Sequence, residues 1–407
     1  FVAYDPIAAG KMKYHFAVDI PTMEATNQKN SGRCWIFAAL NVFREIIGKN
    51  CNIKTFELSE NYVAFWDKFE KINYFLESVI DTAEREVDER TVSWILQNAL
   101  SDGGQWDMIV SLVNKYGVVP MESMPETHLS SNTRVMNQMI LMRLREHAAM
   151  MRTMIADGKN AAAYKDDVLK EMYDALIICF GRPPQTIDFE YTDKDKNYHV
   201  ERNLTPKAFY DKYINLCLDD YVSIINAPTQ DKPYGKLYTV KYLGNVIGGK
   251  EIAYINVDME TLKELIIAQL KDEVVWFGSD VSKFGNREKG VWDKASFGFE
   301  KILNMPFGIT KEQQLDYRDS LMTHAMVITG VNFDESGKAD RWKIQNSWGK
   351  EKAFDGYHVM GAEWFDQYVY QAVIHKKHLS DDLLISLKDA PIELEPWDPM
   401  GALAYCH

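Results

Sequence analysis

The residues in this sequence with the clearest chemical potential are one cysteine, one histidine and two side-chain amides. Cys34 follows Ser-Gly-Arg and stands directly before a tryptophan, and Gln28 lies six positions earlier. His324 lies in a Thr-His-Ala segment, and Asn346 lies in Gln-Asn-Ser-Trp-Gly. A cysteine thiolate is a strong nucleophile, and a histidine beside it can take the thiol proton and later deliver it to a leaving group. A fold that brings these four side chains together could carry out acyl transfer.

Each of these residues also has a plain structural explanation. Cys34 alone could be a buried thiol at the start of a core helix, because cysteine is among the most buried residue types. His324 alone could be a hydrogen-bonded histidine in a strand, and Asn346 could be a turn residue. The combination of the four residues, rather than any one of them, favours catalysis. Three further cysteines in apolar surroundings are predicted to be packing residues: Cys51, Cys179 and Cys217.

The helix that would carry Cys34 is predicted over residues 34 to 47. Apolar positions 36, 40, 43 and 47 share one face, and positions 35, 39, 42 and 46 share another, which is typical of a buried helix. Ser31 and Gly32 are expected to begin it. A cysteine in the first turn would lie in the positive field of the helix dipole, which favours the thiolate.

The other predicted elements follow an order in which helices fill the first half and strands the last third. Helices are expected at about 58–80, 85–101, 105–116 and 260–271, and two more within 131–180. Hairpins are expected at 186–204 and around a Gly248-Gly249 turn. Strands are expected at HAMVITGVNF and RWKIQNSW, which place His324 and Asn346 at strand ends. This segregation predicts the α+β class.

Composition excludes several classes of function. The chain has 407 residues, a length that predicts two domains or one fold with a large insertion. Apolar residues make up 46% of the chain. The formal net charge of −13 argues against nucleic acid as a main partner. We find no apolar run long enough to span a membrane, and the first residues lack the pattern of a signal peptide.

The five cysteines are few, odd in number and scattered, so they predict neither a disulfide framework nor a zinc cluster. The cytoplasm is the expected location. His375 and His378 have a helical spacing that could suit a metal, but no further ligands lie beside them. We therefore expect no metal and no cofactor.

The cysteine, histidine and asparagine segments together resemble the papain superfamily of cysteine peptidases. The resemblance is carried by Gln28 before Gly-Arg-Cys34-Trp, by Thr-His324-Ala and by Asn346-Ser-Trp-Gly. LMTHAMVITGV, LYTVKYLGNVIGG and the C-terminal WDPMGALA are similar to the bleomycin hydrolase and aminopeptidase C branch. The resemblance extends over essentially the whole chain.

Two residues and one spacing depart from the superfamily pattern. Ser31 replaces a cysteine that is disulfide-bonded in secreted members, which fits a reducing compartment. Arg33 replaces a small residue, and no role for it follows from the sequence. His324 lies 290 residues after Cys34, against about 130 to 150 in the plain fold, so an insertion of roughly 150 residues is implied.

The fold implied by the resemblance is a papain-like fold of two lobes. We expect a helical lobe with the nucleophile helix at 1–120 and an inserted helical and hairpin subdomain at 121–245. A β-rich, barrel-like lobe with the histidine and the asparagine would follow at 246–375. Residues 376–407 would form a C-terminal arm that runs into the active-site cleft.

The resemblance also implies a role for each motif residue. Cys34 would be the nucleophile, His324 the acid and base, and Asn346 the residue that orients the imidazole. Gln28 would donate to the oxyanion together with the Cys34 backbone N–H. Trp35 and Trp348 would support the site, the latter by shielding the hydrogen bond between histidine and asparagine. Gly103 and Gly104, in SDGGQWDM, would let an extended substrate approach bare backbone, although they could also be a plain loop.

The C-terminal arm matters for specificity, because in the resembling branch its terminal carboxylate fixes the free α-amine of the substrate. That carboxylate would belong to Ala404, but this chain continues with Tyr405-Cys406-His407. We therefore expect that Cys34 trims the tail, after Ala404. The resemblance further implies a homohexameric barrel whose sites face a central chamber.

Three functions stay open at this stage. The first is a thiol aminopeptidase of broad specificity that acts on peptides with a free α-amine and on amide-bearing xenobiotics such as bleomycin. The second is an endopeptidase, if the arm does not occupy the cleft. The third is an inactive, ring-forming scaffold, against which the intact Gln, Cys, His and Asn set weighs.

Overall fold

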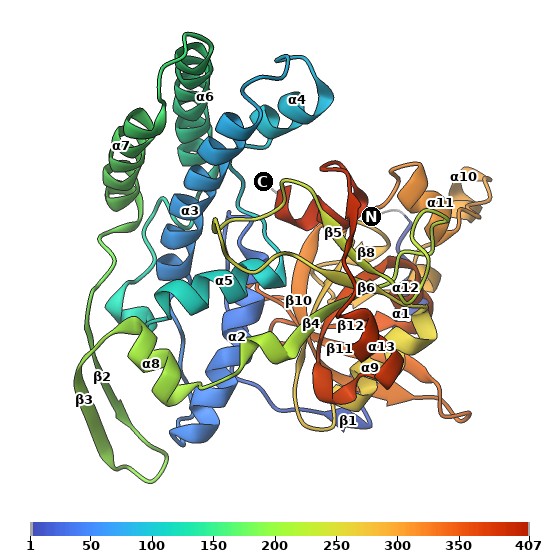
Figure 1. Cartoon of the computed structure of the whole chain (residues 1–407). Helices are drawn as coiled ribbons and strands as arrows, with labels where there is room; N and C mark the ends of the chain where they lie inside the picture. The colour runs from blue at the N-terminus through green and yellow to red at the C-terminus, as the bar shows by residue number, and fades with distance from the viewer. Residues whose placement is uncertain (1–2, 406–407) are drawn as a thin grey trace.

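The computed structural model describes residues 3–405, which form two lobes of different composition. Figure 1 shows a helical lobe on one side and a β-rich lobe on the other, with α2 between them. The helices of the first lobe are α2 (Cys34–Asn50), α3 (Glu60–Asp81), α4 (Arg90–Gln97), α5 (Trp106–Tyr116), α6 (Arg134–Ala156), α7 (Ala162–Phe180) and α8 (Pro206–Tyr213). The antiparallel hairpin β2 (Ile187–Thr192) and β3 (Tyr198–Leu204) extends this lobe, as predicted. The α+β class with two lobes is therefore confirmed.

The second lobe is built on one twelve-stranded sheet, whose strand order is β14-β5-β6-β4-β13-β7-β10-β11-β12-β9-β8, with β1 also paired to β10. In the described residues this order runs open from β14 to β8, so the lobe is not a closed barrel. The strands are β1 (Val18–Asp19), β4 (Tyr221–Ile225), β5 (Leu237–Val240), β6 (Tyr254–Asn256), β7 (Val275–Ser279), β8 (Gly285–Asn286), β9 (Val291–Trp292), β10 (His324–Phe333), β11 (Ala339–Gln345), β12 (Tyr357–Gly361), β13 (Val369–His375) and β14 (Ile392–Leu394).

Shorter helices cover this sheet and end the chain. They are α1 (Pro6–Ala9), α9 (Met259–Gln269), α10 (Phe299–Leu303), α11 (Lys311–Asp316), α12 (Ala362–Tyr368), α13 (Asp381–Ser386) and the 3-10 helices η1 (Met121–Ser123), η2 (Leu218–Asp220), η3 (Lys294–Ser296), η4 (Lys376–His378) and η5 (Pro399–Tyr405). β4 and β5 lie within the segment 121–245, which we expected to be an insertion, yet they belong to the large sheet. Within residues 3–405, no helix is both long and apolar enough to cross a membrane.

The central strand β10 separates two hydrophobic cores, because successive side chains of a strand point to opposite faces. Ala325 and Val327 pack in the core that contains α2 and the other long helices. Met326 and Ile328 pack in the second core, on the other face of the sheet. This arrangement holds the start of α2 against the start of β10, where His324 lies.

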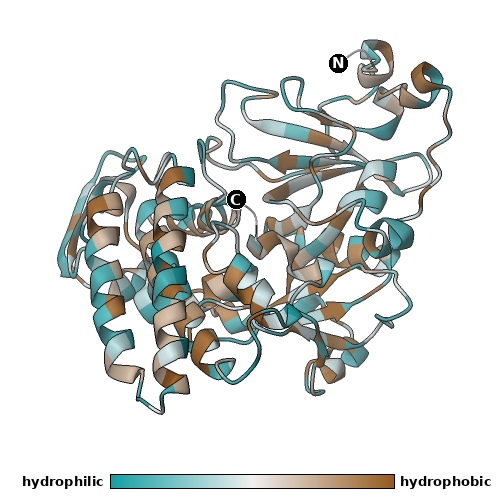
Figure 2. Ribbon diagram, turned by 90° about the horizontal axis from the view of Figure 1, so that it is seen from above, coloured by the Kyte–Doolittle hydropathy of each residue, from teal (hydrophilic) through white to brown (hydrophobic). Residues whose placement is uncertain are grey.

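The methionine-rich helix α6 is amphipathic rather than buried all round. Met136, Leu144 and Met151 are buried in the helical core, whereas Met139 and Met142 are more than half exposed. In the view from above, hydrophobic and hydrophilic residues both occur along the long helices of this lobe (Figure 2). The main use of α6 is thus to complete the helical core.

Several local predictions are wrong. Cys217, which was expected to be a packing residue, is exposed. The residue before α2 is Arg33, and no side chain caps the helix; the Ser31 hydroxyl instead donates to the Gln28 carbonyl oxygen. The predicted hairpin around Gly248 is also different, because β5 and β6 pair only through two residues each and a long loop joins them. Asn245 holds this loop to α3 by a hydrogen bond to Asp67, so tertiary contacts replace the tight turn.

Candidate active site

Cys34 is the first residue of α2, and its side chain is 2% exposed. Its Sγ atom accepts a hydrogen bond from the Ala325 backbone N–H at 3.4 Å. The indole N–H of Trp276, on β7, donates to the Trp35 carbonyl oxygen at 3.2 Å and fixes the first turn of the helix against the sheet. The helix and the sheet therefore place the thiol beside the first residues of β10.

His324 begins β10 and Asn346 follows β11, and their side chains meet. His324 Nε2 lies 2.8 Å from Asn346 Oδ1, and the imidazole is buried. The Trp348 ring stacks on the imidazole with 4.9 Å between centroids, and the Arg287 guanidinium lies over that indole at 4.6 Å. The hydrogen bond is thus screened from water. Because Nε2 is engaged, Nδ1 is the ring nitrogen left for the thiol proton.

Gln28 is held by two hydrogen bonds that leave part of its amide available. Its Oε1 accepts from the Ser347 hydroxyl at 2.6 Å, and its Nε2 donates to the Ser31 carbonyl oxygen at 2.6 Å. An amide nitrogen has two N–H groups, so one remains for a ligand. Gln28, Cys34, His324 and Trp348 line one cavity of about 1030 Å³.

Burial opposes a separate charge on either catalytic group. It raises the pKa of the Cys34 thiol to about 11, although backbone N–H groups, including that of Ala325, lower it. It also lowers the pKa of His324 to about 4, against the hydrogen bond to Asn346, which raises it. A thiolate is therefore favoured here only together with an imidazolium, because each charge then compensates the desolvation of the other.

The hydrogen bond to Asn346 gives a pH-dependent prediction. Because this bond raises the pKa of His324, replacing Asn346 with alanine lowers that pKa, and the imidazolium is lost at lower pH. We expect the alkaline limb of kcat/KM to move to lower pH, and kcat/KM at neutral pH to fall by about tenfold or more. An Asn332→Ala variant, changed at the far end of β10, the strand that begins at His324, is the control. An alkaline limb that stays in place would contradict this role.

Arg33, for which the sequence suggested no role, has a clear structural partner. Its guanidinium binds both carboxylate oxygens of Glu126, at 2.9 and 2.8 Å, and its side chain is 1% exposed. Its Nε donates to the Ser31 hydroxyl at 3.0 Å. Ser31 in turn contacts Gln28 through both its hydroxyl and its carbonyl group. The Arg33–Glu126 pair thus braces the loop that carries Gln28.

Asp102 is a further positioning residue, which we did not single out from the sequence. Its carboxylate accepts from the Gly32 N–H at 2.9 Å and from Lys68 Nζ at 2.6 Å, and its carbonyl oxygen accepts from the Trp35 indole N–H at 2.7 Å. Burial alone would raise the pKa of this carboxyl, but Lys68 and the hydrogen bonds hold it well below its usual range. Asp102 therefore carries a charge that ties the loop before Cys34 to α3.

The glycine pair after Asp102 is explained in part by packing. A side chain on Gly104 would collide with the ring of Trp35. The Gly103 carbonyl oxygen accepts from Lys71 Nζ, a buried lysine that also lies over the Trp35 ring. The small size of Gly104 thus serves Trp35, and the substrate-binding role of Gly103 and Gly104 stays a prediction.

Ala404 lies near the site but outside its cavity. Its carbonyl oxygen accepts from the Ser101 hydroxyl at 2.5 Å, and it lines a separate cavity of about 50 Å³ with Lys71 and Tyr405. Ser101 directly precedes Asp102 in the chain. The contact between Ala404 and Ser101 therefore lies next to the network that supports Cys34. The last two residues of the expected trimming segment, Cys406 and His407, lie outside the described part of the chain.

Three comparisons place these observations among known proteins. A model of the peptidase C1-like family matches residues 2–401. The chain is 45% identical to aminopeptidase C of Listeria innocua, covering 98% of this chain and 91% of that protein. It is 41% identical to bleomycin hydrolase of Gallus gallus, covering 96% and 88%. The crystal structure of PepW from Lactobacillus rhamnosis superimposes with a TM-score of 0.97 at 49% identity, covering 99% of this chain and 92% of that one.

Proposed function

This chain belongs to the peptidase C1-like family, and on that premise we propose that it is a cysteine aminopeptidase that releases N-terminal residues from peptides. The observation that carries the proposal is the meeting of Gln28, Cys34 and His324 in one cavity, with Asn346 bonded to the imidazole. Each of these residue types has a defined task in thiol-dependent acyl transfer. No metal or cofactor is needed for any step.

The first half of the reaction forms an acyl-enzyme. The Cys34 proton moves to His324 Nδ1, and Sγ attacks the carbonyl carbon of the first peptide bond. The resulting oxyanion is held by the Gln28 amide and the Cys34 backbone N–H. His324 then gives the proton to the departing amine, and the C–N bond breaks.

The second half restores the enzyme. A water molecule gives a proton to His324 and attacks the thioester carbonyl carbon, which forms a second oxyanion in the same place. This intermediate collapses as the C–S bond breaks, the amino acid leaves, and Cys34 recovers a proton from His324. Asn346 keeps the imidazole in one plane throughout, because it accepts from Nε2 in both protonation states.

We assign the choice of N-terminal residues to the C-terminal arm. The arm runs from β14 through Trp397 to η5 and ends in the described chain at Tyr405, against the segment that holds Asp102. A carboxylate presented there would pair with the α-ammonium group of a substrate and would exclude a continuing peptide. The arm would thereby limit cleavage to the first residue.

The proposal is tested with aminoacyl fluorophores that carry either a free or a blocked α-amine. We expect hydrolysis of the free-amine substrate and little hydrolysis of the blocked one, both dependent on Cys34. Preferential cleavage of the blocked substrate would support the endopeptidase alternative. Absence of thiol-dependent cleavage of both would support the scaffold alternative.

Self-trimming of the tail is a separate proposal, supported by the three residues that follow Ala404. If Cys34 cleaves after Ala404, the purified wild type will be lighter than its own full sequence by the Tyr-Cys-His residues, whereas Cys34→Ala will keep the mass of its full sequence. If both proteins keep the masses of their full sequences and the wild type is fully active, trimming is not required.

Location, assembly and wider substrates are also proposals. We place the protein in the cytoplasm, because the four cysteines within residues 3–405 are free thiols, which suits a reducing compartment. A homohexamer and the hydrolysis of amide-bearing xenobiotics such as bleomycin follow from the family resemblance. Light scattering and a bleomycin deamidation assay would measure them.

A further inference from the structure

The C-terminal arm is firmly attached to the β-rich lobe at its base. β14 pairs in parallel with β5, and Lys241 Nζ lies 3.2 Å from Glu395 Oε1. Farther along, the buried Lys232 binds Asp398 at 2.9 Å, and the Tyr254 hydroxyl donates to the Met400 carbonyl oxygen at 3.4 Å. These contacts attach the arm to the β-rich lobe.

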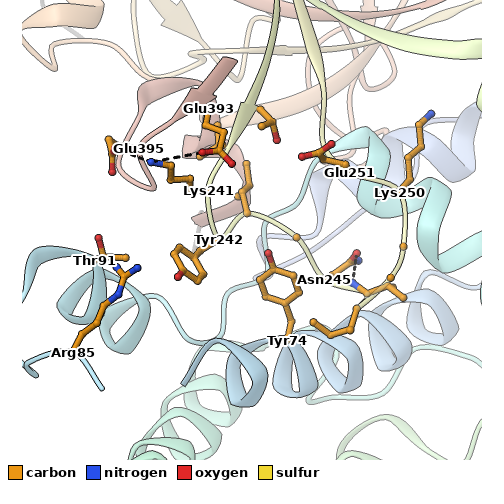
Figure 3. Close-up of a pocket in the computed structure, with 18 residues that line it drawn as sticks. Tyr74, Arg85, Thr91, Lys241, Tyr242, Asn245, Lys250, Glu251, Glu393 and Glu395 are labelled. Atoms are coloured by element: carbon orange, nitrogen blue, oxygen red, sulfur yellow. Dashed lines mark hydrogen bonds and ion pairs between the residues drawn. The ribbon is translucent and has the colours of Figure 1, made fainter. Parts of the chain in front are cut away.

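A cavity separates the base of the arm from the helical lobe. A cavity of about 670 Å³ is lined by residues of both lobes. Figure 3 shows Tyr74, Arg85 and Thr91 on one side of it and Lys241 with the glutamates of the arm on the other. At this cavity the base of the arm does not pack directly on the helical lobe. The attachment of the arm to the helical lobe therefore depends on residues farther along the arm.

The helix α4 supplies part of the contacts to those residues through two side chains on one face. The guanidinium of Arg90 lies 3.7 Å above the Trp397 ring, and the indole of Trp94 meets Trp397 and Tyr405 edge-on, at 6.4 and 5.3 Å between centroids. Residues four apart on a helix lie side by side, so Arg90 and Trp94 form one aromatic and cationic surface. The opposite residues, Val92 and Ile95, are buried in the lobe.

The helix that makes this surface has little stability of its own. It has eight residues, its N-cap Glu89 makes no side-chain capping bond, and such short helices depend on tertiary contacts. The C-terminal carbonyl oxygens of α4, those of Leu96 and Gln97, accept from the guanidinium of Arg145 on α6. The long helix α6 therefore props α4 in place.

The end of the arm then reaches the residues that support the nucleophile. Gln105 donates to the Met400 carbonyl oxygen and Ser101 to that of Ala404. Ser101 lies between Leu100, which lines the Cys34 cavity, and Asp102, which binds the Gly32 N–H. A displacement of η5 would therefore also shift the residues at the edge of the cavity that contains Cys34.

We propose that α4 is the latch of the C-terminal arm, and that Arg90 and Trp94 decide whether the enzyme cleaves only terminal residues. When both hold Trp397 and Tyr405, the arm closes the end of the cleft and a blocked or internal peptide is excluded. When the latch is released, the arm leaves and longer peptides enter. This inference rests on the proposed role of the arm in the preceding subsection.

The experiment compares three kinds of variant of the full chain on free-amine and N-blocked substrates. The latch variants are Arg90→Ala and Trp94→Ala, the control is Gln97→Ala on the exposed side of the same helix, and the reference is a chain that ends at Glu395. We expect each latch variant to raise the ratio of kcat/KM for the blocked substrate to that for the free-amine substrate at least tenfold. Gln97→Ala should leave the ratio within twofold of the wild type.

The chain that ends at Glu395 distinguishes a failure of the latch proposal from a failure of the proposed role of the arm. If the shortened chain gains activity on blocked substrates and neither latch variant does, the arm is gated without α4 and the latch is wrong. If the shortened chain gains none, the arm does not restrict the cleft, and the proposed role of the arm fails with the latch. Arg90 is exposed, so Arg90→Ala keeps the test decisive even if Trp94→Ala unfolds. Equal rates of Cys34 alkylation in all variants would show that the catalytic group itself is unchanged.

Discussion

Replacing Cys34 with alanine is expected to lower kcat on a free-amine substrate by roughly 10⁶-fold, the size of loss seen when a covalent nucleophile is removed. Among residues 3–405, Cys34 is the one thiol that lines the cavity with Gln28 and His324, so no second described thiol can form the acyl-enzyme there. The substitution removes the hydrogen bond from the Ala325 N–H to Sγ. The folded state should still change little, because the Trp276 indole continues to hold the helix start through the Trp35 carbonyl oxygen. Stopped assays of hydrolysis and thermal unfolding of the same samples measure the two effects.

The control for this prediction lies at the other end of the same helix. Cys51 directly follows α2, is 7% exposed and is a free thiol, so Cys51→Ala removes another buried sulfur next to the same helix. We expect this variant to keep wild-type kcat and to lose about 1 kcal/mol of stability. A similar loss of activity in both variants would mean that α2 is disturbed rather than that a nucleophile is missing, and activity in Cys34→Ala would exclude the mechanism.

Local sequence patterns predicted most of the elements, and the resemblance to the papain superfamily predicted the residues of the site. Residues 324–333 were predicted to form a strand and are β10, and the apolar faces of residues 34–47 predicted α2, because a buried helix presents apolar side chains to the neighbours that the fold provides. The positions of His324 and Asn346 at the ends of adjacent strands then follow from antiparallel pairing of β10 and β11. The resemblance to the papain superfamily, rather than a local pattern, joined Cys34 to His324 across 290 positions.

The supporting network could not be predicted, because its members are paired only by the fold. Arg33 and Glu126 lie 93 positions apart, and nothing in the order of residues marks one glutamate among many as the partner. Asp102 stood in the SDGGQWDM segment, but its buried partner Lys68 is an ordinary lysine in a helix pattern. Ser31 suited a helix cap by residue type, yet its hydroxyl is used between Gln28 and Arg33 instead. Charge pairing across long distances carries no local periodicity.

The supporting contacts also involve the segment 121–245, which the sequence predicts to be an insertion. Glu126 and Thr133 belong to the segment that separates α5 from α6, and they bind Arg33 and Asp102 respectively. The loop with Gln28 is thus braced from outside by the extra segment, as the latch helix α4 is propped by Arg145 of α6. Residues of the segment 121–245, which the resemblance predicts to be an insertion, thus support the loop that carries Gln28.

Replacing Gln28 with alanine is expected to lower kcat by roughly 10² to 10³-fold, the cost of losing one oxyanion donor. The donor acts only once negative charge develops on the substrate oxygen, so KM should change little. The side chain is preorganised by Ser347 and Ser31, which means that no reorganisation is needed during the reaction. Steady-state kinetics on a free-amine substrate provide both constants.

Alkylation of Cys34 distinguishes this role from an effect on the nucleophile. Iodoacetamide reacts with the thiolate without forming an oxyanion, so Gln28→Ala should alkylate within a few-fold of the wild-type rate while kcat falls by the larger factor. Gln138 is the matched control, because it is a glutamine that lines the same cavity from α6 and is exposed. Gln138→Ala should retain wild-type kcat. If Gln28→Ala slows alkylation and hydrolysis by the same factor, then Gln28 acts by positioning Cys34, and the oxyanion would have to be held by backbone N–H groups alone.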